Sequence, residues 1–305
     1  MSFSTQLNQQ ILAKNSRICV GLDPRLNWLP SKITKQAIKD HGQCFEAAAA
    51  AILDFNQQVI DIVAPLVAAI KPQIAFYELY GPPGLKAFEQ TVAYAHQRNL
   101  LVIGDVKRSD IASTAAAYAQ AMLDQTDLFG QPKPVFNLDC ITINPFLGQD
   151  SLEPFTKVAQ TQKKGLFILV KTSNPGSADF QDLIVEGKTI TTRLANLVNQ
   201  LAQAEKQNKQ YSNIGAVVGA TFPQQAAGLR QLMPNSIFLV PGVGAQGGSE
   251  AELRVFFNSD KLGALVNSSR GIIFSKKGRE GPGYLKLIKD NTIKLRDQVN
   301  QAVGA

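Results

Sequence analysis

The sequence predicts an α/β protein built as a closed parallel (β/α)8 barrel of the TIM-barrel type. Two observations favour this fold. Eight short runs rich in β-branched and apolar residues alternate along the chain with longer stretches of helical character. Most of these runs are continuously apolar and do not alternate with polar residues, as expected for strands covered on both faces. The count matters, because one strand more or fewer would favour an open doubly wound sheet.

The expected strands follow one another at regular intervals. In chain order they are Arg17–Asp23, Val67–Lys71, Leu100–Lys107, Cys140–Asn144, Gly165–Lys171, Ile214–Ala220, Ser236–Val240 and Leu262–Ser268. The clearest helical stretches between them are Cys44–Ala64, Pro83–Arg98, Ser113–Leu123 and Thr189–Gln207. Two long connections, Pro24–Gln43 and Pro175–Lys188, follow the carboxyl ends of strands, where barrel enzymes place their chemistry. No Pro-, Gly- or Ser-rich linker divides the chain, so we expect one domain spanning residues 1–305.

The composition is that of an ordinary globular protein. Hydrophobic residues make up 45% of the chain and charged residues 18%, which argues against disorder. No uninterrupted apolar run reaches the roughly 18 residues of a membrane span. The opening residues, MSFSTQLNQQ, lack the pattern of a secretory signal. We therefore expect a cytoplasmic protein without a membrane partner.

Charge and cysteine content narrow the range of partners. The net charge is +7, yet no dense basic run with interleaved aromatic residues occurs. We therefore expect no nucleic-acid partner, whereas an anionic small molecule is compatible with the charge. The three cysteines form no CxxC pair, and Cys19 and Cys140 lie in expected strands, where reduced core thiols are usual. Only two histidines, His41 and His96, are present, which argues against a His-rich zinc or iron site.

Charged residues recur at the carboxyl ends of the expected strands or directly after them. They are Asp23, Lys71, Asp105, Lys107, Lys171 and Arg270. In a parallel barrel these ends gather at one rim. A single charged residue at such a place is commonly just solvated, but a convergent set is hard to explain by solvation alone. We therefore expect an active site at this rim.

The segment D-V-K-R-S-D holds the sharpest pair of charges. Asp105 and Lys107 are two residues apart on a strand, so their side chains point to the same side, inward if Val106 faces the helices. Asp110 follows at the start of the next helix. Acids that alternate with lysines in one cavity keep the lysines protonated and the acids ionised. A protonated lysine that is shielded from water can donate its proton to a substrate. The alternative interpretation is a salt-bridge network at the rim.

A phosphate site is expected after the last two strands. The segment Pro241–Gly248, PGVGAQGG, is rich in glycine, which lets the backbone approach an anion. Arg270 supplies a guanidinium group that can bind an anion through two N–H groups. Loops in these two places form the common phosphate site of such barrels. Gly242, Gly244 and Gly247 also match G-x-G-x-x-G. A dinucleotide site is disfavoured, because the match lies late in the chain and no acid ends the next strand.

The segment Asp105–Ile111, D-V-K-R-S-D-I, resembles the D-x-K-x-x-D-I signature of the orotidine 5′-phosphate decarboxylase family. The resemblance extends from Gly21 to Arg270, and the stretch K-R-S-D-I-A-S-T-A-A-A-Y-A is similar to the longer bacterial-type branch. It implies a (β/α)8 barrel that works as a homodimer with shared active sites, without metal or cofactor. It also implies the ligands orotidine 5′-phosphate and UMP, and the last step of de novo UMP biosynthesis.

The resemblance also implies roles for individual residues. Lys107 matches the lysine that protonates C6 once carbon dioxide leaves, and Asp105 matches the acid beside the scissile carboxylate. Lys71 matches the lysine that joins this charge network. Asp110 and, on the same helix, Thr114 match residues that reach into the neighbouring subunit's site.

The remaining matched positions bind substrate. Asp23 matches the acid near the ribose hydroxyls, and Ser173 matches the serine that contacts the pyrimidine edge. Gln246 matches the residue that bridges base and phosphate. The backbone of Ser269, together with Arg270, matches the phosphate site. The two long connections exceed those of the family's short forms, so the loops over the site are expected to differ.

Two other functions remain open from the sequence. A sister barrel with the same D-x-K-x-x-D core could act on a sugar phosphate with magnesium, although Ser173 and Gln246 as base-binding residues argue against it. The chain could also be a non-catalytic protein with the same barrel that binds phosphate or a nucleotide. The intact array of acids and lysines argues against that alternative.

Overall fold

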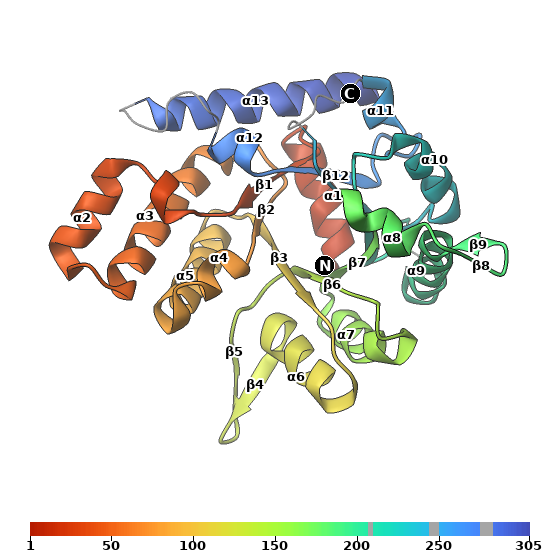
Figure 1. The fold of residues 1–305 in the computed structure, drawn as a ribbon, viewed down its shortest axis with the longest axis horizontal. Coiled ribbons are helices and arrows are strands. Elements are labelled where there is room, and N and C mark those ends of the chain that lie inside the picture. Colours follow the sequence, from red (N-terminus) through yellow and green to blue (C-terminus); the bar gives the residue numbers. More distant parts are fainter. Residues whose placement is uncertain (207–209, 244–249, 275–282) are drawn as a thin grey trace.

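The computed structural model describes residues 1–206, 210–243, 250–274 and 283–305. Eight parallel strands close into a barrel in the order β1, β12, β11, β10, β7, β6, β3, β2 (Figure 1). Their bounds are β1 Ile18–Leu22, β2 Ala69–Pro72, β3 Leu101–Arg108, β6 Cys140–Ile143, β7 Gly165–Lys171, β10 Ile214–Val218, β11 Phe238–Pro241 and β12 Ala264–Ser268. The predicted (β/α)8 barrel is confirmed, and so is each of the eight predicted strands.

Helices surround the barrel. The four predicted ones are confirmed as α3 Phe45–Val63, α5 Gly81–Gln97, α6 Ala112–Leu123 and α9 Ile190–Lys206. The others are α1 Phe3–Ala13, α2 Ser31–His41, α4 Ala75–Glu78, α7 Gln149–Gln162, α8 Ala178–Gln181, α10 Pro223–Leu232, α11 Glu250–Arg254, α12 Arg270–Ile273 and α13 Tyr284–Val303, with 3-10 turns at Leu26–Trp28 and Pro175–Ser177. Helix α3 illustrates why these segments are helical. Its alanines favour helix, and Ile52, Phe55 and Val59 recur at helical spacing on its buried face.

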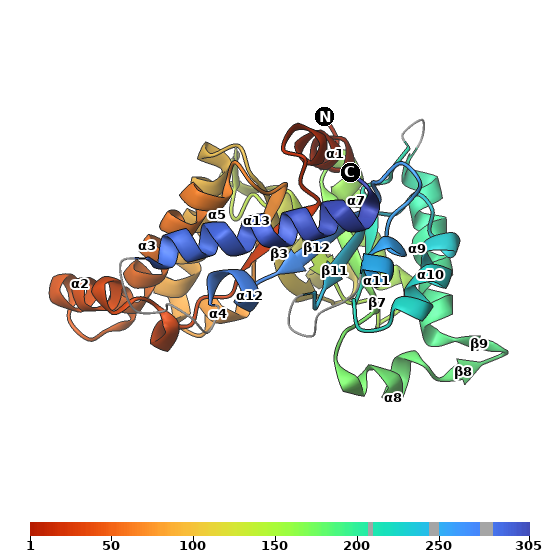
Figure 2. The same cartoon turned by 90° about the horizontal axis from the view of Figure 1, so that it is seen from above.

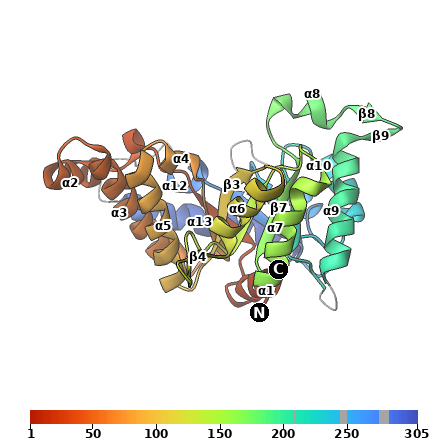
Figure 3. The same cartoon turned by 90° about the horizontal axis from the view of Figure 1, so that it is seen from below.

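Two short hairpins were not predicted. They pair β4 Gln125–Leu128 with β5 Gln131–Pro134, and β8 Ile184–Val185 with β9 Lys188–Thr189. The turn between β8 and β9 places Glu186 at φ +51° and Gly187 at φ +74°, the left-handed backbone of a tight hairpin turn. Prolines in β5 argue against a strand when the sequence is considered alone. Helix α8 and the β8–β9 hairpin extend away from the barrel, at the end of the molecule opposite α1 (Figures 2 and 3).

The core has an outer layer between strands and helices and an inner layer inside the barrel. Cys19 and Cys140 are fully buried in the inner layer, as predicted. Helix α1 adds Phe3, Leu7 and Ile11 to this inner layer. The Phe3 backbone N–H donates to the carbonyl of Lys163, which precedes β7, so α1 covers the amino-terminal ends of the strands. Helix α1 therefore closes the barrel at the amino-terminal ends of the strands, opposite the rim formed by their carboxyl ends.

This arrangement predicts a large effect on stability for Leu7→Ala. Leu7 is fully buried, and the variant should lose about 2–5 kcal/mol of unfolding free energy, measured by urea denaturation. Activity should persist, because Leu7 lies at the end away from the rim. The matched control is Leu12→Ala on the same helix, where the side chain is exposed. Equal losses in the two variants would contradict the role assigned to α1.

No helix within the described ranges combines the length and the apolar character needed to cross a membrane.

Candidate active site

Three charged side chains from two neighbouring strands meet at the carboxyl rim of the barrel. The Lys71 ammonium lies 2.6 Å from Asp105 Oδ2, and the Lys107 ammonium lies 2.5 Å from Asp105 Oδ1. The Lys71 and Asp105 side chains are only 5% and 11% exposed. The strand ends bring these residues together as predicted, and one carboxylate binds two ammonium groups.

The β3 backbone departs from the regular pleat at this point. Val106 packs in the outer core, as the expected inward orientation of its neighbours requires. Lys107, however, has a φ of +43°, and the β3–β6 register shifts between Gly104 and Arg108. A left-handed backbone costs a non-glycine residue roughly 1–2 kcal/mol. Such strain is concentrated at functional sites, where the surrounding structure holds it in place.

Within the described part of the chain, Lys107 is not shielded from water as expected. Its side chain is 46% exposed, because it lies at the open mouth of the barrel, whereas Lys71 and Asp105 are buried. The expectation was therefore wrong for Lys107 in this single chain. Its ammonium is nevertheless fixed by the carboxylate of Asp105.

Opposite charges keep the buried pair ionised. Burial by itself would lower the pKa of Lys71, but the negative charges of Asp105 and Asp23 outweigh it and raise that pKa above its ordinary value. Burial by itself would raise the pKa of Asp105. The charges of Lys71 and Lys107, with their hydrogen bonds, instead hold the Asp105 pKa well below its usual range. The site thus contains a fixed charge array.

Thr142, a residue that the sequence did not indicate, supports this array from strand β6. Its hydroxyl donates to Asp105 Oδ1 at 3.0 Å and accepts the backbone N–H groups of Val106 and Lys107 at 3.1 and 3.0 Å. The residue is 1% exposed. One hydroxyl therefore orients the carboxylate and also stabilises the strained turn at Lys107. A threonine inside an apolar strand, C-I-T-I-N, is the only signal in the sequence for it.

Asp110 and Thr114 lie apart from the cluster. Asp110 Oδ1 accepts the backbone N–H of Ile111 at 2.8 Å, and Thr114 is exposed on α6. Among the described residues, no ion pair joins Asp110 to the lysines of the cluster. The resemblance places both residues in a neighbouring subunit's site, so their roles stay predictions.

Asp23, directly after β1, and Asn267, on β12, present acceptor oxygens at the rim. Asp23 Oδ1 is buried and has no hydrogen-bond partner within the described ranges, and the same is true of Asn267 Oδ1 on β12. Strands β1 and β12 are neighbours, with Cys19 paired to Asn267. Buried acceptors without donors suit a ligand that carries hydroxyl groups. Asn267 was not among the predicted site residues, although it lies two residues before Ser269, which was.

Ser173 lies after β7 and contacts the residues that follow β10. A Cβ atom on Gly219 would lie 2.9 Å from the Ser173 Cα atom, so only glycine permits this approach. Thr221 Oγ1 donates to the Ser173 carbonyl at 3.2 Å. Ser269 and Arg270 stand at the start of α12, where Arg270 is exposed. Gln246, Gly244 and Gly247 lie outside the described residues.

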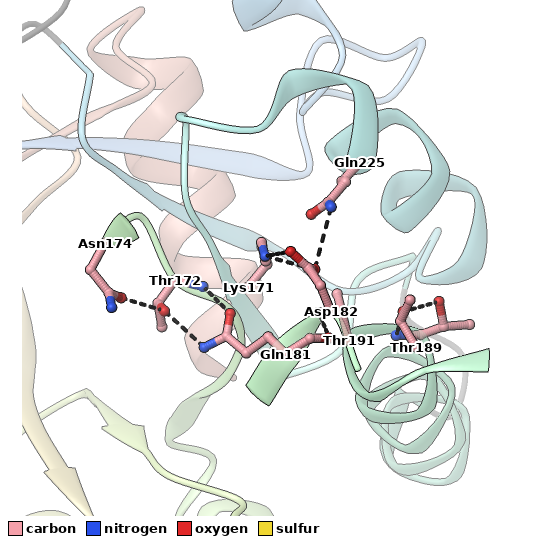
Figure 4. Close-up of polar contacts among 9 residues, drawn as sticks. Lys171, Thr172, Asn174, Gln181, Asp182, Thr189, Thr191 and Gln225 are labelled. Carbon is pink, nitrogen blue, oxygen red and sulfur yellow. Dashed lines mark hydrogen bonds and ion pairs between the residues drawn. The ribbon is translucent and has the colours of Figure 1, made fainter. Parts of the chain in front are cut away.

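Lys171 does not join the array, although it ends a strand. Its side chain is fully buried, and its ammonium lies 2.8 Å from Asp182 Oδ1 (Figure 4). Lys171 is therefore not part of the set of charged side chains that was expected to meet at the rim. Within the described ranges, no cluster of three or more His, Cys, Asp and Glu side chains has the arrangement of a metal site.

The charge array predicts a plateau of stability between about pH 4 and pH 10. The folded pKa of Asp105 is depressed, so its contribution is present above its unfolded value and lost as the pH falls. The folded pKa of Lys71 is raised, so its contribution is present below its unfolded value and lost as the pH rises through the folded one. Urea unfolding across pH measures both limbs. A Lys71→Met/Asp105→Leu variant should flatten them, and an unchanged profile would contradict the assignment.

The chain is similar to known proteins over most of its length. A family model described as Orotidine 5′-phosphate decarboxylase / HUMPS family matches residues 16–281. An orotidine 5′-phosphate decarboxylase of Rhodopirellula baltica is 46% identical over 280 residues, 92% of this chain and 91% of the relative. One of Caldicellulosiruptor bescii is 38% identical over 304 residues, 100% of both. The solved structure of Leishmania donovani OMP decarboxylase has a TM-score of 0.76 at 30% identity and covers 100% of both chains.

These matches extend across all eight strands of the barrel and include the segments that carry Lys71, Asp105 and Lys107. They confirm the resemblance suggested by the D-x-K-x-x-D-I motif. On the fold, the motif and the extent of the match, the chain belongs to the orotidine 5′-phosphate decarboxylase / HUMPS family.

Proposed function

We propose that this protein decarboxylates orotidine 5′-phosphate to UMP and carbon dioxide, the last step of de novo UMP biosynthesis, without a metal or cofactor. The observation that carries the proposal is the Asp105 carboxylate bonded to both Lys71 and Lys107 at the mouth of the barrel. The names of the relatives support the same activity.

The reaction breaks the bond between C6 and the substrate carboxylate. The electron pair of that bond stays on C6, carbon dioxide leaves, and the Lys107 ammonium gives its proton to C6 and becomes a neutral amine. No ring position takes up the electrons, so the enzyme must stabilise the charge with groups that are already oriented. Lys71 and Thr142 supply this orientation by fixing Asp105, which in turn fixes the Lys107 ammonium.

Substrate binding uses groups around the same rim. Asp23 accepts hydrogen bonds from the ribose hydroxyls, and Ser173 contacts the pyrimidine edge. Gln246 bridges base and phosphate, while the Ser269 backbone and Arg270 bind the phosphate. Asp23 Oδ1 is buried and has no hydrogen-bond partner among the residues that the structure describes, which supports this role. Phosphate binding, remote from the bond that breaks, contributes binding energy to the reacting state.

The active unit in this proposal is a homodimer whose subunits share their sites. Asp110 and Thr114 then act in the partner's cavity. Exposed apolar side chains on the loops after the adjacent strands β3 and β6 support an interface here, namely Ile111, Phe146 and Leu147. Covering such side chains with a second subunit would bury apolar surface next to Asp110.

The decisive experiment follows orotidine 5′-phosphate consumption by ultraviolet absorbance, with a chelator present throughout. We expect full turnover under these conditions. Activity that disappears with the chelator would favour a magnesium-dependent sugar-phosphate enzyme. Tight UMP binding without release of carbon dioxide would favour a non-catalytic nucleotide binder.

A further inference from the structure

The protein contains a fully buried lysine that the proposed chemistry does not use. The Lys171 side chain is 0% exposed, and its ammonium lies 2.8 and 2.9 Å from the two oxygens of Asp182. The ring of Phe222 covers the ammonium at 4.5 Å. An unpaired ammonium is costly to bury, so the ion pair holds Asp182 against the end of β7.

Thr172, which follows Lys171, and Gln181, which precedes Asp182, make a second connection. Gln181 Oε1 accepts the Thr172 backbone N–H at 3.0 Å, and Gln181 Nε2 donates to Thr172 Oγ1 at 2.8 Å. Thr191 Oγ1 donates to the Gln181 carbonyl at 2.8 Å and ties the group to α9. The last residue of β7 and the residue after it are thus bonded to the residue after α8 and to the last residue of α8 (Figure 4). We call Lys171, Thr172, Gln181 and Asp182 the loop clamp.

The loop clamp closes the base of the loop 173–180, and Ser173 is the first residue of that loop. On its other side, Ser173 is packed against Gly219, and its carbonyl accepts a hydrogen bond from Thr221. A loop joined at its base has fewer accessible conformations than an open one, so less entropy is lost when it orders on a ligand. The clamp therefore restricts where the Ser173 hydroxyl can lie.

We propose that Gln181 and Asp182 are positioning residues that orient Ser173 for recognition of the pyrimidine base. This inference rests on the proposed function, because it assigns Ser173 to the base. The clamp acts on affinity for the base, and the chemistry at Lys107 is separate from it.

The test compares two ligands by titration calorimetry: UMP, and ribose 5-phosphate, which lacks the base. Gln181→Leu removes both hydrogen bonds to Thr172 without leaving a buried charge. It should raise the Kd of UMP by about fivefold to tenfold, the effect of about one hydrogen bond, and leave the Kd of ribose 5-phosphate unchanged. An equal loss for both ligands would show general damage to the loop and overturn the proposal.

A double-mutant cycle with Ser173→Ala tests whether Gln181 affects UMP binding through Ser173. If Gln181 acts through Ser173, the double variant should bind UMP no more weakly than Ser173→Ala alone, whereas additive losses would overturn the proposal. Asp179→Asn, on the same helix and exposed, is the matched control. Should Gln181→Leu fail to fold, Lys171→Met/Asp182→Leu removes the ion pair as a unit and carries the same expectation.

Binding of UMP and ribose 5-phosphate by the wild-type protein distinguishes a failure of the clamp proposal from a failure of the proposed function. A wild-type protein that binds UMP no better than ribose 5-phosphate overturns the proposed function, and the clamp proposal with it. A wild-type protein that prefers UMP, with clamp variants that keep the full preference, overturns the clamp proposal alone.

Discussion

Lys107→Met should lower kcat by about a thousandfold or more and leave the fold intact. Loss of a positioned proton donor and of a fixed charge each costs about two to four orders of magnitude in rate. The Lys107 side chain is half-exposed, so little stability should be lost. The ultraviolet assay with saturating orotidine 5′-phosphate measures the effect.

The matched control for this variant is Lys133→Met, an exposed lysine on β5. It removes the same charge from the protein and should keep wild-type turnover. Wild-type turnover by Lys107→Met, with the substitution verified, would remove Lys107 from the proposed role as proton donor.

Asp105→Asn should damage stability and activity together. The substitution leaves the Lys71 ammonium buried at 5% exposure beside a neutral amide, and breaking such a pair costs about 3–5 kcal/mol. Without its partner, the Lys71 pKa should fall below its ordinary value. The variant should therefore gain stability as the pH rises towards about 10, where the unfolded lysine also loses its proton. Urea denaturation at several pH values tests the sign.

Two further variants separate charge from packing at this site. Asp127→Asn, exposed on β4, should behave as the wild type. Lys71→Met/Asp105→Leu should recover much of the stability, because no charge stays buried alone, while activity remains lost. A double variant as unstable as Asp105→Asn would mean that the cost does not come from the unpaired ammonium.

The fold was largely predictable because barrel strands are covered on both faces and read as continuous apolar runs. β7, Gly165–Lys171, was predicted with its observed bounds for this reason. The cluster was predictable as well, since the spacing of Asp105 and Lys107 and the end of β2 are local features of the sequence. The left-handed φ of Lys107 was not, because it lies where the β3–β6 register shifts, and the pairing of two distant strands is not a local feature of the sequence.

Other parts of the site depend on contacts between segments that no local pattern encodes. Thr142 acquires its place only when β6 pairs with β3. Lys171 was expected at the common rim, but a carboxylate eleven residues further along the chain binds it instead. The functional roles of all the predicted site residues, Asp110, Thr114 and Gln246 among them, stay predictions.

The positive φ of Lys107 has a practical consequence for protein engineering. Glycine adopts this backbone conformation without steric cost, so Lys107→Gly relieves a local penalty while it deletes the ammonium. A laboratory screen that rewards heat resistance alone would favour this substitution, which removes the proposed proton donor. Libraries that include position 107 therefore have to be scored for turnover at every round.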